Sequence, residues 1–281
     1  MKGTTGRAPA PHARSAKGLP RKVVIKIGGA AAETPNVRRG LAKQIASLRQ
    51  AGSDVVVVHG GGKLLTQTLA RMGIPTEFAN GLRVTDPETR DVALMVLAGM
   101  SNKQWVAEIE NWGQRAIGIC GGDARLVEAR QLLSEQGRNL GFVGRPRKVN
   151  PELLEMAFER SMVPVVASVA LGPKGEYFNV NADDFAAAIA DHLPADRLIY
   201  LTESGGVWNA ERKLLPRIKR KQISGMIRSG TIRNGMIPKL RSCQRVLAGR
   251  VTEIDMMSPE VPDGLLGILS GDAQPGTRIV K

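Results

Sequence analysis

The chain has 281 residues, of which 42% are hydrophobic and 23% are charged. This is enough for one large α/β domain, or two lobes that share a sheet, and no apolar run reaches the roughly 20 residues of a membrane span. Cys120 and Cys243 are too few to form a metal cage, and their apolar neighbours favour free thiols in a reducing cytosol.

The net charge of +14 is concentrated in two segments. Residues 1–22 carry six Lys/Arg and no acid, and residues 209–250 carry twelve Lys/Arg and one acid, so the remainder is slightly acidic. Only 4% of the residues are aromatic, which leaves little surface on which nucleic-acid bases stack. We therefore expect a phosphate-rich small molecule, or a solvated basic face, rather than nucleic acid.

Residues 1–21 combine Gly, Pro, Ala and Arg without apolar periodicity, which is typical of a disordered basic arm. The arm lacks the continuous apolar core of a secretory signal. It has some features of an organelle transit peptide, and its role stays open.

From Lys22 onward strands alternate with helices, and β-branched runs such as "VVVV" at 55–58 indicate a parallel sheet buried on both faces. Gly52 and Gly73 end the first two helices, and Asn150 caps a later one. Strands are expected at 22–27, 54–59, 116–120, 163–170, 197–203, 251–257 and 276–280, helices at 36–52, 63–73, 86–113, 150–161, 182–193, 220–230 and 235–248, and hairpins at 75–85 and near 139–149. The predicted fold class is α/β, a three-layer αβα sandwich around a mainly parallel sheet.

Glycines end two consecutive strands, in "KIGG" at 26–29 and "HGGG" at 59–62. In parallel sheets ligands lie at the carboxyl ends of strands, where glycine lets backbone N–H groups approach an anion. The spacing fits neither a Rossmann nor a P-loop motif, so tight turns are the alternative. Lys26, inside an apolar strand, favours an anion or a carboxylate partner.

The stretch "NVNADD" begins a helix with Asn179, Asn181, Asp183 and Asp184. These residues form either a simple helix cap or a site in which an amide grips a substrate carboxylate and an aspartate orients lysines. Lys239 starts a later helix and, taken alone, would be a surface residue.

Seven motifs together resemble the amino acid kinase family, in family order from residue 22 to the end of the sequence. They favour its acetylglutamate branch over the carbamate, aspartate, glutamate and uridylate branches. The motifs are "KIGG" at 26–29, "HGGG" at 59–62, "NGLRVTD" at 80–86, "LAGMSNK" at 97–103, "LGFVG" at 140–144, "NVNAD" at 179–183 and "GMIPK" at 235–239.

The resemblance implies an ATP-dependent enzyme of arginine biosynthesis that phosphorylates the side-chain carboxylate of N-acetyl-L-glutamate, with Mg²⁺ carried by ATP. It implies catalytic roles for Lys26, Lys239 and Asp183. It implies substrate binding by Gly60, Gly61, Arg83 and Asn179, and ATP binding by Gly28, Gly29, Thr202, Glu203, Gly235 and Met236. A carboxylate is already ionised at pH 7, so the reaction needs no general base, and His59 is expected to brace its glycine loop.

The resemblance further implies a cytoplasmic homodimer, with residues 22–180 holding the amino acid and the dimer contact, and residues 181–281 holding ATP. The apolar stripe at 93–100 either serves that contact or belongs to the core.

Two features depart from the family pattern. Glu203 replaces the usual aspartate, and the arm lacks the periodicity of a hexamer-forming helix. Alternatives left open are a kinase for carrier-linked aminoadipate, a non-catalytic regulatory or nucleic-acid-binding protein on this fold, and a docking surface for a regulatory protein at 212–250.

Overall fold

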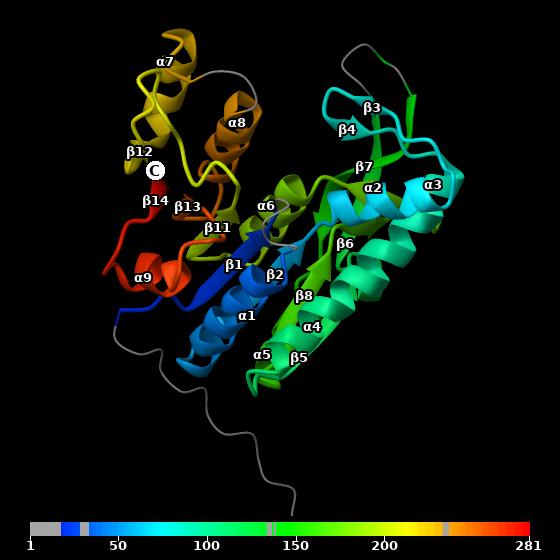
Figure 1. The fold of residues 1–281 in the computed structure, drawn as a ribbon, viewed down its shortest axis with the longest axis horizontal. Coiled ribbons are helices and arrows are strands. Elements are labelled where there is room, and N and C mark those ends of the chain that lie inside the picture. Colours follow the sequence, from blue (N-terminus) through cyan, green and yellow to red (C-terminus); the bar gives the residue numbers. More distant parts are fainter. Residues whose placement is uncertain (1–17, 29–33, 134–136, 138, 233–235) are drawn as a thin grey trace, which may run out of the picture.

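A computed structural model describes residues 18–28, 34–133, 137, 139–232 and 236–281, so most of the basic arm lies outside the described residues. Its core is one eight-stranded sheet in the order β12-β14-β13-β11-β1-β2-β8-β5 (Figure 1). The strands are β1 (Lys22–Ile27), β2 (Asp54–His59), β5 (Ala116–Cys120), β8 (Val163–Ala167), β11 (Arg197–Leu201), β12 (Arg217–Lys219), β13 (Glu253–Met257) and β14 (Gly276–Val280). All neighbours pair in parallel except β13 with β14, which are antiparallel.

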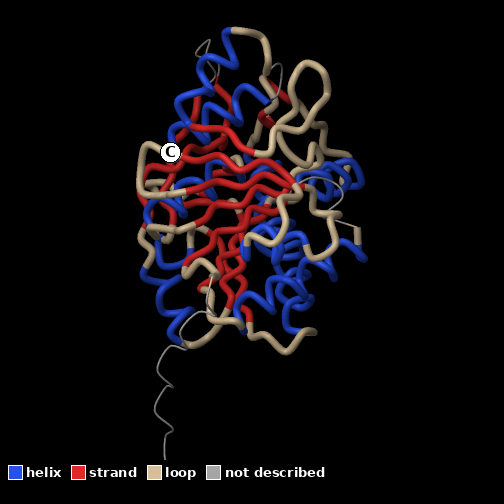
Figure 2. Tube along the Cα trace, turned by 90° about the vertical axis from the view of Figure 1, so that its left-hand side faces the viewer, coloured by secondary structure: helices blue, strands red, loops and turns tan. Residues whose placement is uncertain are grey.

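Helices cover both faces of this sheet because successive strand residues point to opposite sides. Val23 and Ile25 pack on the face covered by α1 (Pro35–Gln50), α4 (Asn102–Glu110) and α9 (Gly264–Ser270). Val24 and Val56 pack on the face covered by α5 (Glu152–Glu159), α6 (Ala182–His192), α7 (Ile223–Arg228) and α8 (Met236–Val246). Figure 2 shows the strands between the helical layers, so the predicted sandwich is confirmed.

A second, four-stranded sheet closes on itself beside the main one. It consists of β6 (Val127–Leu133), β7 (Asn139–Val149), β9 (Val169–Leu171) and β10 (Tyr177–Val180). The prediction of one strand over 163–170 is wrong, because β8 ends at Ala167 and the chain crosses at Ser168 into β9. This crossing carries the chain from the main sheet to Asn179, at the end of β10.

The predicted helical region after Asp86 contains three parts: α3 (Pro87–Ala93), a π-helix (Leu94–Ser101) and α4. Asp86 caps α3 by accepting a hydrogen bond of 2.7 Å from the Thr89 N–H. The hairpin predicted over 75–85 is present as β3 (Phe78–Ala79) and β4 (Leu82–Arg83), and α2 (Gly62–Arg71) follows the second glycine run. No helix in the described part of the chain is long and apolar enough to span a bilayer.

Candidate active site

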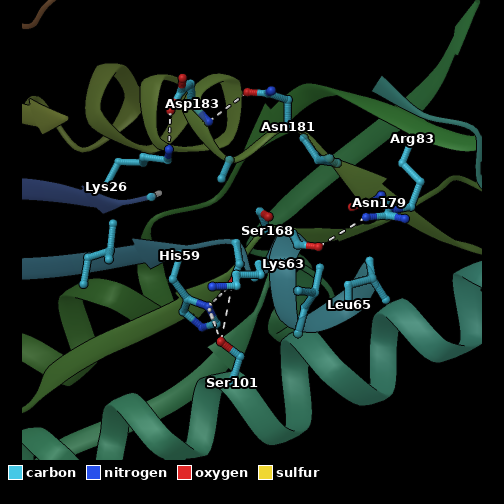
Figure 3. Close-up of a pocket in the computed structure, with 18 of the residues that line it drawn as sticks. Lys26, His59, Lys63, Leu65, Arg83, Ser101, Ser168, Asn179, Asn181 and Asp183 are labelled. Atoms are coloured by element: carbon cyan, nitrogen blue, oxygen red, sulfur yellow. Dashed lines mark hydrogen bonds and ion pairs between the residues drawn. The ribbon is translucent and has the colours of Figure 1, made fainter. Parts of the chain in front are cut away.

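A cleft of about 400 Å³ lies at the carboxyl ends of β1, β2 and β8 (Figure 3). It is lined by Gly28, Gly60 and Ser168, which directly follow these strands, and by Asp183 of α6. Among the described residues that line it, Asp183 is the only acid, whereas Lys26, Lys63 and Arg83 are cations. The cleft is therefore electropositive and suits an anionic ligand.

Asp183 joins two lysines that are far apart in the sequence. Its Oδ1 lies 2.7 Å from Lys26 Nζ and its Oδ2 lies 3.3 Å from Lys239 Nζ. Burial alone raises the pKa of Asp183, but Lys26 and Lys239 outweigh it, so the net direction of the pKa is down. The carboxylate therefore stays ionised and holds two ammonium groups, that of Lys26, which lines the cleft, and that of Lys239.

Asn181 explains why Asp183 is held in place. Its side-chain oxygen caps α6 by accepting hydrogen bonds from the N–H groups of Asp183 and Asp184, at 2.9 and 3.2 Å. The Tyr200 hydroxyl donates to the Asp183 carbonyl at 3.3 Å. The helix-cap interpretation of "NVNADD" is confirmed at Asn181, and Asp183 lies where it can orient lysines (Figure 3). The grip of an amide on a substrate carboxylate stays a prediction.

Gly28 leaves room for the Lys26 ammonium. A Cβ at this position would collide with Lys26 Nζ and would lie 2.9 Å from Lys26 Cε and 3.6 Å from the Leu201 carbonyl oxygen. A side chain at residue 28 would thus displace the lysine head or press on the end of β11. Gly29 and Gly235, both expected at the ATP site, lie outside the described residues.

Gly60 and Gly61 line the cleft between β2 and α2. His59, which precedes them, is buried, and its Nδ1 lies 2.8 Å from the Gly60 carbonyl oxygen. Burial lowers the pKa of His59 to about 4, although the bond to Gly60 acts in the opposite direction. The ring is neutral at pH 7 and braces the loop, as expected from the sequence.

Arg83 is buried at the far end of the cleft without a carboxylate partner among the described residues. Its guanidinium donates only to neutral oxygens, on Thr66 at 2.7 Å and on Gly62 and Thr76 at 3.2 Å. Burial lowers its pKa, and yet a guanidinium remains charged in proteins. Asn179 lines the same end of the cleft and donates to Thr85 Oγ1 at 3.4 Å. A buried positive charge and an amide that line the same end of a cleft suit a ligand carboxylate.

The remaining residues predicted to bind ATP lie outside this cleft. Thr202 and Glu203 follow β11, the neighbour of β1, and the Thr202 N–H donates to the Met257 carbonyl at 2.9 Å. Met236 begins α8 and packs against the core. Their role in ATP binding stays a prediction.

Three polar residues at the cleft were not singled out from the sequence: Lys63, Ser101 and Ser168. Lys63 directly follows "HGGG", so its place in the sequence already indicated that it lies near the glycine loop. Ser101 is the last residue of the π-helix and lies within the motif "LAGMSNK", which gave it no role of its own. Ser168 directly follows β8, inside the segment expected to be one strand, so its position had no signal in the sequence.

Comparison with known proteins agrees with the fold. The model of the Amino acid kinase family matches residues 21–257, and the chain belongs to this family. The chain is 43% identical over 259 residues to the acetylglutamate kinase of Koribacter versatilis, covering 92% of this chain and 98% of the relative. It is 41% identical to the acetylglutamate kinase of Bartonella quintana, covering 92% of this chain and 89% of the relative.

A solved structure, N-acetylglutamate synthase from Neisseria gonorrhoeae with coenzyme A and N-acetyl-glutamate, has a TM-score of 0.81 and 22% identity. It covers 94% of this chain, which spans 60% of the synthase chain. At this identity the likeness concerns the fold alone.

Proposed function

We propose that this enzyme transfers the γ-phosphoryl group of ATP to the side-chain carboxylate of N-acetyl-L-glutamate, giving an acyl phosphate in arginine biosynthesis. One observation carries the proposal: Lys26 and Lys239 converge on Asp183 at the glycine-lined ends of the strands. The names and coverage of the curated relatives support the choice of acceptor.

The proposed mechanism is alignment and charge stabilisation. The two reacting groups are anions that repel one another, and in-line phosphoryl transfer needs positive charge around them. Lys26 and Lys239 would stabilise the phosphoryl group in transfer, and Asp183 would hold both ammonium groups. The N–H groups near Gly28, Gly60 and Gly61 would donate to phosphate and to the reacting carboxylate, while Arg83 and Asn179 would bind the α-carboxylate.

No base is required, because the nucleophile is already ionised at neutral pH. His59 is buried with both ring nitrogens engaged, so it does not compete for this role.

The described residues do not form a site for a resident Mg²⁺. No group of three or more acids, histidines or cysteines among them could hold a metal ion. Asp183 is the only acid among the described lining residues, and its two oxygens face two ammonium groups. In this proposal Mg²⁺ arrives bound to the ATP phosphates, where it supplies further positive charge.

The finer features of the proposal concern organisation. Residues 22–180 would bind the amino acid and form a homodimer contact, and residues 181–281 would bind ATP. The proposed dimer contact is supported by two exposed apolar side chains of the π-helix, Met95 at 57% and Met100 at 46% exposure, because exposed apolar side chains often mark protein contacts. Cys120 and Cys243 are buried free thiols, which supports the cytoplasm as the place of the reaction.

The test is acyl-phosphate formation from ATP and N-acetylglutamate, trapped with hydroxylamine and read as a coloured hydroxamate. N-acetylaspartate, free glutamate and N-acetyl-aminoadipate serve as comparison acceptors, ranked by kcat/KM. We expect N-acetylglutamate to rank first and Lys239→Ala to remove the signal. Folded protein that gives no hydroxamate at millimolar N-acetylglutamate, or that prefers the aminoadipate compound, would refute the proposed substrate.

A further inference from the structure

Behind the glycine loop, a buried cluster links His59 to the start of α4. Asn102 is fully buried, and its Nδ2 lies 3.1 Å from His59 Nε2, 2.9 Å from the Val165 carbonyl oxygen and 3.2 Å from that of Ile119. Its Oδ1 lies 3.2 Å from Lys103 Nζ. The proposed mechanism has no use for this side chain, although it is a fully buried polar group close to the cleft.

These neighbours fix the orientation of the Asn102 amide. Carbonyl oxygens only accept and an ammonium only donates, so the amide nitrogen must face Val165 and Ile119, and the amide oxygen must face Lys103. This nitrogen has two hydrogens for three acceptors, the two carbonyl oxygens and His59 Nε2, so one hydrogen is shared between two of them. Since the nitrogen has no acceptor to offer, His59 Nε2 has to be the accepting atom of the ring. The proton of the neutral ring therefore sits on Nδ1, where it is donated to the Gly60 carbonyl at 2.8 Å.

A protonated ring would place a second donor at Nε2, facing the Asn102 amide donor. The charged groups near the ring also oppose protonation. Lys103 contacts Asn102, and the cleft is lined by Lys26 and Lys63, whereas Asp183 is the only acid among its described lining residues. Burial acts in the same direction on the pKa of His59. The ring is thus locked in one protonation state and one tautomer.

The tautomer determines where a backbone donor of the loop points. In a planar trans peptide the carbonyl of one residue and the N–H of the next point in opposite directions. Since the Gly60 carbonyl is held by His59, the Gly61 N–H is turned to the other side of the peptide plane. No oxygen of the described residues accepts a hydrogen bond from it. Leu97 and Ser101, of the π-helix, pack against Gly61 from behind.

We propose that Asn102 is a positioning residue of the active site. Acting through the His59 ring, it fixes the Gly60–Gly61 peptide so that the Gly61 N–H is presented to the anionic groups of the reaction. The assignment deepens the phosphoryl transfer proposed above and rests on it. Figure 3 shows His59 beneath the cleft, with Ser101 of the π-helix beside it.

We call the chain of contacts from Asn102 through the His59 ring to the Gly60 carbonyl the relay. Two substitutions at residue 59 test its two contacts separately: the one with Gly60 and the one with Asn102. In His59→Asn the amide nitrogen lies near the place of Nδ1, so it can still donate to Gly60. In His59→Gln the amide reaches the place of Nε2, so the contact with Asn102 survives and the bond to Gly60 is lost. We expect kcat to stay within a few-fold of the parent for His59→Asn and to fall about 10²-fold for His59→Gln, the usual loss of one aligned donor.

Asn102→Leu removes the relay at its start and has a matched control. Gln114 is also a buried amide that donates to two backbone carbonyls, on Arg115 at 3.0 Å and Ser161 at 2.8 Å, but it lies at the opposite end of β5 from the glycine loop. We expect Asn102→Leu to lower kcat at least tenfold with little change in KM, and Gln114→Leu to lower stability while leaving kcat unchanged.

A readout without substrate is the ¹⁵N NMR spectrum of the histidine rings. The chain has only three histidines, so His59→Asn assigns the signal of His59. The parent should show the Nδ1–H tautomer without titration from pH 8 to pH 5.5, and Asn102→Leu should show mixed tautomers or a raised pKa.

An Nε2–H tautomer or a titrating His59 in the parent would overturn the inference, as would a parent-like kcat in His59→Gln. The NMR experiment needs no substrate, so it tests the role of Asn102 even if N-acetylglutamate proves not to be the substrate. Failure of this inference and failure of the proposed function are therefore distinguishable. If Asn102→Leu does not fold, the pair of substitutions at residue 59 decides.

Discussion

The carboxylate of Asp183 should be worth more to this protein than that of any nearby acid, and Asp183→Asn tests this. The substitution keeps the shape but leaves the ammonium groups of Lys26 and Lys239 without their shared anion. At an effective dielectric constant near 20, the attraction is about 6 kcal/mol at 2.7 Å and about 5 kcal/mol at 3.3 Å. Desolvation of the ions offsets much of this gross energy.

The loss of unfolding free energy expected for a broken ion pair depends on how exposed the side chains are. Lys26, Asp183 and Lys239 are 12%, 21% and 20% exposed, so they are neither fully buried nor screened like a surface pair. We expect Asp183→Asn to lower the free energy of unfolding by about 3 kcal/mol, at the low end for a broken buried pair. The assay is urea unfolding at pH 7, with kcat measured alongside and expected to fall about 10²-fold.

The neighbouring acid provides the control, because its pKa moves in the opposite direction. Burial raises the pKa of Asp184, so its charged form costs folding free energy at pH 7 and Asp184→Asn should be neutral or stabilising. The pKa of Asp183 is lowered, so its contribution is present above the unfolded pKa and disappears as pH falls through the folded pKa. The difference in unfolding free energy between the parent and Asp183→Asn should therefore become smaller at acidic pH.

A double variant isolates the orphaned charge. Adding Lys239→Met to Asp183→Asn removes one uncompensated ammonium group and should restore part of the stability but none of the activity. Equal stability of Asp183→Asn and Asp184→Asn, or strictly additive losses in the double variant, would refute the reasoning.

Three further predictions concern the rate and the KM for each substrate. Lys239→Ala should lower kcat at least 10²-fold with little change in either KM, because its charge acts on the phosphoryl group in transfer; steady-state kinetics with an unchanged kcat would remove it from the mechanism. Gly28→Ala should lower kcat at least tenfold while urea unfolding shifts by less than about 1 kcal/mol, because the methyl group collides with the flexible head of Lys26; full activity would contradict the packing seen here. Arg83→Met should raise the KM for N-acetylglutamate at least tenfold and leave the KM for ATP unchanged, as expected for a lost carboxylate contact; parallel changes in both values would argue against that role.

The sheet was largely predictable because its strands are continuous apolar runs buried on both faces. The runs "KVVIKIGG" and "DVVVVHGGG" were expected as strands with glycine ends, and they contain β1 (Lys22–Ile27) and β2 (Asp54–His59). Their glycine ends mark the ligand edge for the same reason. The layers, the helix caps at Asp86 and Asn181 and the bracing role of His59 also follow from local sequence.

The small sheet was not predictable in the same way. β6 reads "VEARQLL", with charged and polar residues among the apolar ones, and its strand identity comes from pairing with β7. β12 has three residues and α9 has seven, too short to show a period. The π-helix lies within an apolar run that shows an ordinary helical pattern, and nothing in that pattern marks the extra residue per turn.

At the site, it was easier to predict which side chains take part than which of them contact one another. Lys26 and Asp183 each had a local signal, and the sequence could not place Lys239 beside them without the resemblance. Asn102 lies in the motif "LAGMSNK", but it was given no role, since a polar residue in an amphipathic helix is usually on the water side. The roles predicted for these side chains stay predictions until the variants above are measured.

The place of β1 in the middle of the sheet has a consequence for how the enzyme gains activity during folding. β1 pairs with β2, which follows closely in sequence, and with β11, where Lys22 donates to Asp196 across a sequence separation of 174. Closing such a long loop costs entropy before its contacts form, so this seam is expected to close late. α6, which carries Asp183 to Lys26, packs against β1 and directly precedes β11. A chain diluted from denaturant should therefore regain helical circular dichroism before it regains turnover.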